Sequence, residues 1–484
     1  MAIHLINAIH DEYGVNITLR EIFNNTTIEK LSGLIKGRGT ESVIHIPPVE
    51  ERDYYPASPA QKRLFYEQLL SEENMGYHIC SIYEILEEVD LGRIKAAFQS
   101  LVNRHESLRT CFKLLGDEVV QRIMPEMDFN IPEFDNTRYL TVDAALEEFV
   151  QPFDLSAAPL IRCALLNYQG RRNLLFIDIH HIICDGVSLS ILLNDFKQFY
   201  GGLEPAPLTL RYVDYAAWKR SSTPAGERQK KYWLEKLSGQ IPVLDLPVSQ
   251  NRKRPGVYAT DNKTLELNGA QYQRIRKFTS AADVSDFMMF LSAYYMLLSR
   301  ISGNTDIIIG TDVVGRTQAD LNTIVGTFIN WLPLRLQIDP QCSFMAFLKK
   351  VRSCVLEAFD NQDFPFEEMV SRLSMEKRLN GKLFDVHFSV ANYLDNAAHL
   401  DEIKMVPWEL RFKEKTPFEF KLEVTDKGDK FSFTFIYARE LYDGETMELF
   451  IRYYYNILMA VLDNEYIKLE DVEVMERQDY VLQD

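Results

Sequence analysis

The sequence lacks the features that mark two large classes of protein. It has no apolar run of the roughly 18 residues that indicate a membrane-spanning helix, and its first residues, MAIHLINAIHDEYG, indicate an amphipathic helix rather than a signal peptide. The net charge is −17, and an acidic surface repels phosphate backbones. We therefore expect a cytoplasmic protein that binds neither membrane nor nucleic acid.

Cysteine pairs are also missing. The six cysteines are scattered, and no two form a Cys-x-x-Cys pair, which favours free and mostly buried thiols over disulfides or a zinc site. Apolar residues, by contrast, are plentiful at 46%, so a chain of 484 residues can fill several cores. We expect a well-packed globular protein without a bound metal.

The pattern of residues changes along the chain. Residues 1–37 predict three short helices, which cannot bury much core alone and should be part of a larger domain. Residues 38–52 have the Gly, Pro and charge of a linker. Strands and helices then alternate, and the simplest division gives two α/β lobes at residues 53–225 and 226–475, with a connector at residues 476–484.

The stretch IDIHHIICDGVS has adjacent histidines, His180 and His181, followed by Asp185 and Gly186. A strand ends here, and its alternating side chains should point the two histidines apart, so that they cannot bind one metal together. Gly186 permits a tight turn into the next helix, whose N–H groups could stabilise an oxyanion, while Asp185 could cap that helix or pair with an arginine. Taken alone, such a group is more often structural than catalytic, and no nucleophilic serine accompanies it.

Other segments add to this stretch. Together with it, and in the correct order, they resemble the signature motifs of the condensation domains of nonribosomal peptide synthetases, in which IHHIICDGVS matches the active-site motif HHxxxDG. The other five are SPAQKRLFYEQL (58–69), RHESLRTCF (104–112), YVDYAAW (212–218), VGTFINWLPLR (325–335) and NQDFPFE (361–367). The seventh signature fits only at Leu383-Phe384-Asp385, and Cys184, Trp331 and Pro333 also depart from the usual residues. The resemblance covers about residues 53–475.

The two ends of the chain resemble neighbouring parts of such a synthetase. Within residues 1–37, LREIFNNTTIEKLSGLI is similar to the third and fourth helices of a peptidyl carrier protein. In that family the serine that carries phosphopantetheine stands before the helix that here begins the chain, so we expect no prosthetic arm on this segment. ERQDYVLQD, at residues 476–484, resembles the start of a linker to an adenylation domain.

The resemblance implies a fold and a reaction. The fold would be α/β (α+β), with two chloramphenicol-acetyltransferase-like lobes in a V-shaped pseudodimer, a tunnel between them, and a small helical fragment at the N-terminus. An acyltransferase-type reaction would join a donor peptidyl or aminoacyl thioester to the α-amine of an acceptor aminoacyl thioester. Both substrates would arrive on 4'-phosphopantetheine of carrier domains, with no cofactor bound by the condensation domain itself. The partners would be an upstream donor carrier, a downstream acceptor carrier and an adenylation domain, in antibiotic or other secondary metabolism.

The resemblance also implies roles for residues. His181 would lie near the centre of the tunnel, orient the acceptor amine and accept its proton, while His180 would pack and hydrogen-bond in the loop. We expect Asp185 to be structural and to pair with Arg104 or Arg109 of RHESLRT, because an unpaired buried carboxylate is costly. Asn330 and Gly186 are further candidates, for the support and wall of the tunnel.

Three other functions are alternatives for a chain with these motifs. An epimerisation domain shares HHxxxDG but moves a proton at Cα, and it lacks a segment of the GTFINWLPLR type. A heterocyclisation domain would carry aspartates in place of the histidines. A third possibility is a non-catalytic platform that only docks carriers, which the complete set of His181, Asp185 and Gly186 disfavours. The carrier remnant directly before the condensation region, together with SPAQKRLFYEQL and DGVSLSILL, favours the subtype that takes an L-configured donor.

Overall fold

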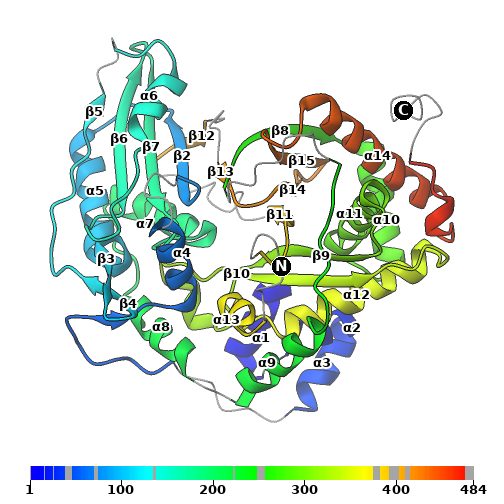
Figure 1. Cartoon of the computed structure of the whole chain (residues 1–484). Helices are drawn as coiled ribbons and strands as arrows, with labels where there is room; N and C mark the ends of the chain where they lie inside the picture. Colours follow the sequence, from blue (N-terminus) through cyan, green and yellow to red (C-terminus); the bar gives the residue numbers. More distant parts are fainter. Residues whose placement is uncertain are drawn as a thin grey trace.

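The computed structural model describes residues 2–15, 17–25, 27–38, 46–69, 75–134, 138–221, 224–247, 257–373, 382–391, 403–408 and 415–474. It places two α/β lobes side by side, with the N-terminal helices beneath the second lobe (Figure 1). The expected connector at residues 476–484 lies outside the described residues. Among the described helices, none has the length and apolarity that crossing a bilayer requires.

Three short helices form the N-terminal segment, as the sequence predicts: α1 (Ala2–Tyr13), α2 (Leu19–Asn24) and α3 (Ile28–Lys36). Gly14 ends α1 in the left-handed region at φ 64°, and Thr18 and Thr27 cap the next two helices. The small core of this segment consists of Ile9, Val15 and Ile17. It rests on the second lobe through α2, where Arg20 pairs with Asp360 at 2.9 Å.

The first lobe is built on a five-stranded sheet in the order β12-β2-β7-β6-β5. Its strands are β2 (His78–Ile85), β5 (Glu133–Phe134), β6 (Ile161–Tyr168), β7 (Arg172–His180) and β12 (Met405–Pro407). A smaller sheet has the order β1-β4-β3, with β1 (Tyr55–Pro56), β3 (Thr110–Leu115) and β4 (Glu118–Ile123). The helices of this part of the chain are α4 (Pro59–Leu69), α5 (Leu91–Arg104), α6 (Val142–Phe149), α7 (Gly186–Tyr200), α8 (Tyr212–Arg220) and α9 (Pro224–Lys236).

Alternation along β7 divides the first lobe into two cores. Leu175, Ile177 and Ile179 pack on the side of α5 and α7, whereas Leu174 and Phe176 pack on the side of α6. This is the alternation that the sequence predicts for the strand before the two histidines. It places consecutive residues at the end of β7 in different surroundings.

The second lobe is built on a seven-stranded sheet in the order β10-β9-β11-β14-β15-β8-β13. The strands are β8 (Tyr258–Glu266), β9 (Asp306–Val313), β10 (Asn330–Gln337), β11 (Val386–Ala391), β13 (Lys415–Thr416), β14 (Phe420–Asp426) and β15 (Phe431–Ala438). The helices are α10 (Gly269–Ala281), α11 (Asp286–Ser302), α12 (Phe344–Asp360), α13 (Phe366–Arg372) and α14 (Gly444–Asp463).

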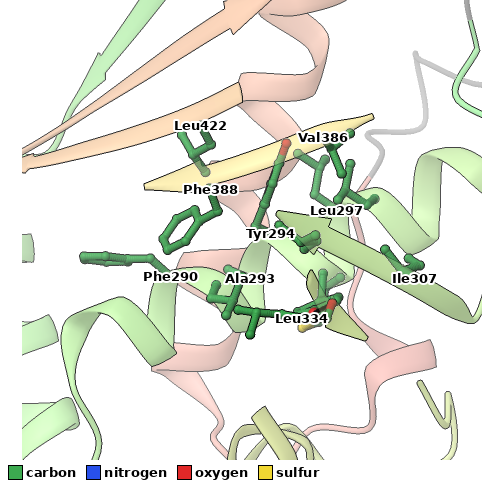
Figure 2. Packing of buried hydrophobic residues seen from close by; sticks show 14 of the residues in the cluster. Phe290, Ala293, Tyr294, Leu297, Ile307, Leu334, Val386, Phe388 and Leu422 are labelled. Atoms are coloured by element: carbon green, nitrogen blue, oxygen red, sulfur yellow. Dashed lines mark hydrogen bonds between the residues drawn. The ribbon is translucent and has the colours of Figure 1, made fainter. Parts of the chain in front are cut away.

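One face of the seven-stranded sheet is apolar and covered by helices. Figure 2 shows Phe290, Tyr294 and Leu297 of α11 against Phe388 of β11 and Leu422 of β14. Pairing of β11 with β14 in parallel sets Phe388 opposite Leu422, so both face this core. The residues between them, such as His387, therefore belong to the other face of the sheet.

The chain crosses between the lobes after the second lobe has begun. Strand β12 comes late in the sequence but pairs antiparallel with β2 of the first lobe, setting Met405 opposite Ile85. Earlier, residues 316–328, which include the short 3-10 helix η2 (Ala319–Thr323), pack Leu321 and Phe328 in one cluster with Tyr212 of α8. These crossings bring the second half of the chain to the start of α7.

Candidate active site

The candidate site lies where β7 ends and α7 begins. His180 is the last residue of β7, His181 opens a tight turn, and Asp185 is the N-cap of α7. His180 is fully buried, whereas His181 remains partly exposed to solvent. The two imidazoles thus have different environments.

His180 is held inside the first lobe. Its Nδ1 accepts a hydrogen bond from the N–H of Ile182 at 3.0 Å, and its ring lies edge-on to Phe153 and near the ring of His78. Burial, with smaller contributions from the charges of His78, His181 and Arg162, lowers the pKa of His180 well below its usual value. A neutral ring that accepts a bond from the next turn supports a packing role for this histidine.

His181 faces both halves of the chain. The pKa of His181 lies below its ordinary value. Burial is the largest cause, and the charge of Arg63 acts in the same direction. The carboxylates of Asp185 and Asp312 and the backbone of Cys184 act in the opposite direction without reversing the shift. The imidazole is therefore neutral near pH 7, the form that can accept a proton. Its backbone N–H is fixed by the carbonyl of Tyr77 at 2.8 Å.

Asp185 has every feature of a structural carboxylate. It is 1% exposed and accepts hydrogen bonds from the N–H of Ser188 at 2.7 Å, from Arg316 Nη2 at 3.2 Å and from the N–H of Phe328 at 3.1 Å. Ser188 belongs to α7, whereas Arg316 and Phe328 come from the crossing segment of the second half. The carboxylate therefore joins the two halves beside His181.

The expected partners of Asp185 were wrong. Arg104 instead binds Asp195 at 2.9 Å, a carboxylate that also contacts Nε2 of His105 at 2.9 Å. Arg109 lies 3.6 Å from Glu106. Both arginines end or follow α5, which packs along α7, so they meet side chains of their own lobe. Arg316 could be suspected from sequence only as a charged residue directly after the apolar strand β9.

Residues of five signature segments meet at this junction. Ser188 Oγ accepts the N–H of Gly326 at 3.0 Å and donates to its carbonyl at 2.8 Å. Tyr212 donates to the carbonyl of Thr327 at 2.5 Å and bonds Ser58 at 2.9 Å. In the segment RHESLRTCF, the hydroxyl of Ser107 donates to the carbonyl of Val325 at 2.6 Å. The separate motifs of the sequence are thus one hydrogen-bonded frame.

Gly326 is required by the close approach of this frame. A Cβ built on Gly326 would lie 1.9 Å from Cδ2 of Tyr212, far inside any allowed contact. The preceding turn also needs glycine, because Gly315 has φ 69° and its Cβ would meet the carbonyl oxygen of Phe328 at 2.0 Å. The two glycines let the crossing segment reach the start of α7.

Asn330 and Gly186, the other candidates, have distinct positions. The amide of Asn330 donates to the carbonyls of Gln362 and Phe364, both at 2.8 Å, and accepts from the N–H of Phe366 at 3.0 Å. It therefore joins the fifth and sixth signatures, which supports a structural role. Gly186 is the first residue of α7 and is partly buried.

The cysteines agree with the sequence analysis. All six are free thiols, and burial raises the pKa of Cys184 in the site well above its usual value, so this thiol is not an activated nucleophile. No cluster of three or more His, Cys, Asp or Glu side chains with metal-binding geometry occurs in the described ranges.

The N-terminal segment does not fit a prosthetic arm. Its one serine is Ser32, a partly buried residue in the middle of α3. An arm attached there would emerge from inside a formed helix. Ser32 is therefore not a site for the arm.

Comparisons with known proteins agree with the motif pattern. Residues 51–481 match the family model described as condensation domain, and residues 1–35 match the one described as phosphopantetheine attachment site. Gramicidin S synthase 2 of Brevibacillus brevis is 33% identical over 482 residues, which cover 99% of this chain and 11% of that protein. The chain thus spans about a tenth of the length of this curated relative.

Solved structures support the fold. The condensation domain from monacolin K polyketide synthase superposes with a TM-score of 0.74 at 20% identity, covering 87% of this chain and 100% of the other. A four-domain nonribosomal peptide synthetase bound to AMP and glycine gives a TM-score of 0.80 at 17% identity, covering 90% and 35% of the two chains. The predicted two-lobe α/β fold of the chloramphenicol-acetyltransferase type is confirmed.

Proposed function

Because the chain belongs to the condensation-domain family of nonribosomal peptide synthetases, we propose that it forms a peptide bond between two carrier-bound substrates. A donor peptidyl or aminoacyl thioester would be attacked by the α-amine of an acceptor aminoacyl thioester, with both substrates carried on phosphopantetheine. The single observation that supports this most directly is the state of His181. It is a partly exposed imidazole whose pKa is lowered by burial, beside a frame in which three hydrogen bonds hold the Asp185 carboxylate.

The chemistry demands little of the base. An α-amine has a pKa of about 8, so a fraction on the order of a tenth is neutral at pH 7, and a thioester is an activated acyl group. Holding the two reactants together contributes about 7 kcal/mol or more to lowering the barrier. As the C–N bond forms, one proton of the nitrogen passes to His181, the C–S bond breaks, and the released sulfur takes up a proton.

The partners follow from the same reaction. An upstream carrier would deliver the donor and a downstream carrier the acceptor, and an adenylation domain would follow residue 475. We propose an L-configured donor, in line with the sequence pattern of the segments 58–69 and 185–193. The N-terminal segment would then be a part of the upstream carrier, folded against α12 through the contact of Arg20 with Asp360.

A turnover assay with two loaded carriers tests the proposal. We expect a new amide on the acceptor carrier, measured by mass spectrometry. Inversion at Cα would instead indicate epimerisation, and binding of both carriers without product would indicate a docking platform.

The variant His181→Ala addresses the residue itself. Amide formation should fall by about 10²-fold or more, the range of general base catalysis, with an unchanged unfolding midpoint because the side chain is partly exposed. Wild-type activity in this variant, with both carriers still binding, would remove His181 from the mechanism.

A further inference from the structure

The face of the second-lobe sheet that lies away from its helices carries a row of charged and polar side chains. We call Asp312, His387, Lys421 and Glu423 the polar row. Pairing of β11 sets His387 opposite Gly310 and Lys421, so these residues and Asp312, two residues beyond Gly310, share one face. The alternate residues face the apolar core, as Phe388 and Leu422 do in Figure 2. The four side chains form two pairs, His387 with Asp312 at 3.2 Å and Lys421 with Glu423 at 2.9 Å.

The helix α4 links the polar row to the turn that begins with His181. Gln61 of α4 donates to the carbonyl of Ile182, next to His181, at 3.4 Å. Two residues further on, the guanidinium of Arg63 lies 3.9 Å from the ring centroid of Trp331. Trp331 is paired directly with Asp312 across β9 and β10. Asp312 therefore lies on the face of the second-lobe sheet that meets Arg63 of α4.

Asp312 is both charged and accessible. Within the described ranges, one hydrogen bond reaches its carboxylate, from Nε2 of His387 at 3.2 Å, and its side chain is 34% exposed. Burial opposes ionisation, yet the charges and hydrogen bond of His387, with Lys421 and Arg63, hold the pKa of Asp312 at about 2. The charge of Asp312 in turn raises the pKa of His181, although burial keeps that pKa below its ordinary value.

We propose that Asp312 binds the α-ammonium group of the acceptor substrate and holds it beside His181. This inference rests on the proposed function, because it assigns a further residue to the same reaction. Most of an α-amine is protonated at pH 7, so the acceptor arrives as a cation. An ionised carboxylate has about four acceptor positions, and His387 occupies one in Asp312, which leaves room for an ammonium group. Asp185 cannot do this, since it is 1% exposed and already accepts three hydrogen bonds from the frame.

The proton balance fits the two groups. The ammonium bound at Asp312 loses one proton to solvent, which leaves a neutral nitrogen. As the C–N bond forms, a second proton passes from that nitrogen to His181, and the sulfur takes up this proton when the C–S bond breaks. Amide and thiol are formed, and His181 is returned to its neutral form.

The test compares two acceptors in wild type and in Asp312→Asn. One carrier is loaded with an aminoacyl group and the other with the matching aminooxyacyl group, whose nitrogen is much less basic and is neutral at pH 7. Asp306→Asn is the matched control, because Asp306 lies on the same strand, is 30% exposed and pairs with Arg335 at 2.7 Å. It stands about 20 Å away along β9.

We expect Asp312→Asn to lose about tenfold or more with the aminoacyl carrier, chiefly as a higher KM for that carrier. Turnover of the aminooxyacyl carrier should stay within about twofold of wild type, which also shows that the variant is folded. Asp312→Glu should recover most of the loss, and Asp306→Asn should resemble wild type with both carriers.

Two results would overturn the inference while leaving the proposed function intact: wild type forms amide and Asp312→Asn is unimpaired, or it loses the same factor with both carriers. Absence of amide from wild type with the aminoacyl carrier would instead refute the proposed function. The comparison therefore separates the two failures.

Discussion

Two carboxylates act on His181, and their surroundings are opposite. Asp185 is 1% exposed and accepts three hydrogen bonds, from α7 and from the crossing segment. Asp312 is 34% exposed and, among the described residues, accepts one, from His387 of its own sheet. A carboxylate whose acceptor positions are filled can only hold the fold in place, whereas one with open positions and a secured charge can bind a ligand. The HHxxxDG motif contains the first kind, and the second kind comes from a strand that the motif does not include.

Among the substitutions that affect these two carboxylates, Arg316→Ala should lower the free energy of unfolding the most. This change leaves Asp185 buried without its countercharge, and removing one partner of a buried ion pair costs about 3–5 kcal/mol. Urea unfolding followed by circular dichroism should show this loss in the free energy of unfolding. Arg274→Ala, which opens an exposed pair with Asp463, serves as the control and should cost about 1 kcal/mol or less. A loss of that smaller size in Arg316→Ala would contradict the structural role of Asp185.

Gly326→Ala attacks the same frame without touching a charge. The added methyl would overlap Tyr212, and relieving such overpacking costs about 1–3 kcal/mol. We expect a lower thermal midpoint and, because Phe328 moves away from Asp185, reduced amide formation. Gly33→Ala is the control, because an added Cβ at Gly33 has no neighbour within 4 Å, and it should leave stability nearly unchanged. Gly428 is not suitable as a control, because its φ of 86° would strain any other residue. Equal midpoints for the two variants would refute the close approach.

The smallest effect on stability should come from Asp312→Asn. The folded-state pKa of Asp312, about 2, lies below the unfolded value of about 3.9, so its stabilisation is present above pH 4 and is lost as the pH falls towards 2. Because the side chain is a third exposed, solvent screens the pair, and we expect about 1 kcal/mol or less at pH 7. Between pH 2 and 7, the free energy of unfolding should change less with pH in the variant than in wild type. A loss above about 3 kcal/mol would make Asp312 a structural residue like Asp185.

Local sequence was enough for the parts of the site that lie close together in the chain. The alternation before His180, the cap at Asp185 and the helix from Gly186 follow from neighbouring residues and appear as predicted. The three short helices expected within residues 1–37 are a further example. The resemblance of the motif around His181 then indicated a family, and the structure has the fold of that family.

The errors and omissions all concern partners that are distant in the chain. Arg104 and Arg109 were expected near Asp185 because their segment is a signature motif, but sequence order does not say which face of α5 meets α7. Strand β12 has three residues, too few for any periodicity, and exists because the edge of β2 is open to it. Asp312 ends an apolar strand and carries no motif of its own.

The sequence by itself determined which residues share a strand face or a helix end, because the periods of 2 and 3.6 residues are properties of the local backbone. It thereby set His180 and His181 apart and made Asp185 a helix cap. Only the tertiary structure decided that Arg316 would neutralise Asp185 and that Asp312 would pair with His387 on the sheet face away from the helices, because those pairings depend on how distant segments pack. Asp185 is therefore buried, whereas Asp312 is partly exposed.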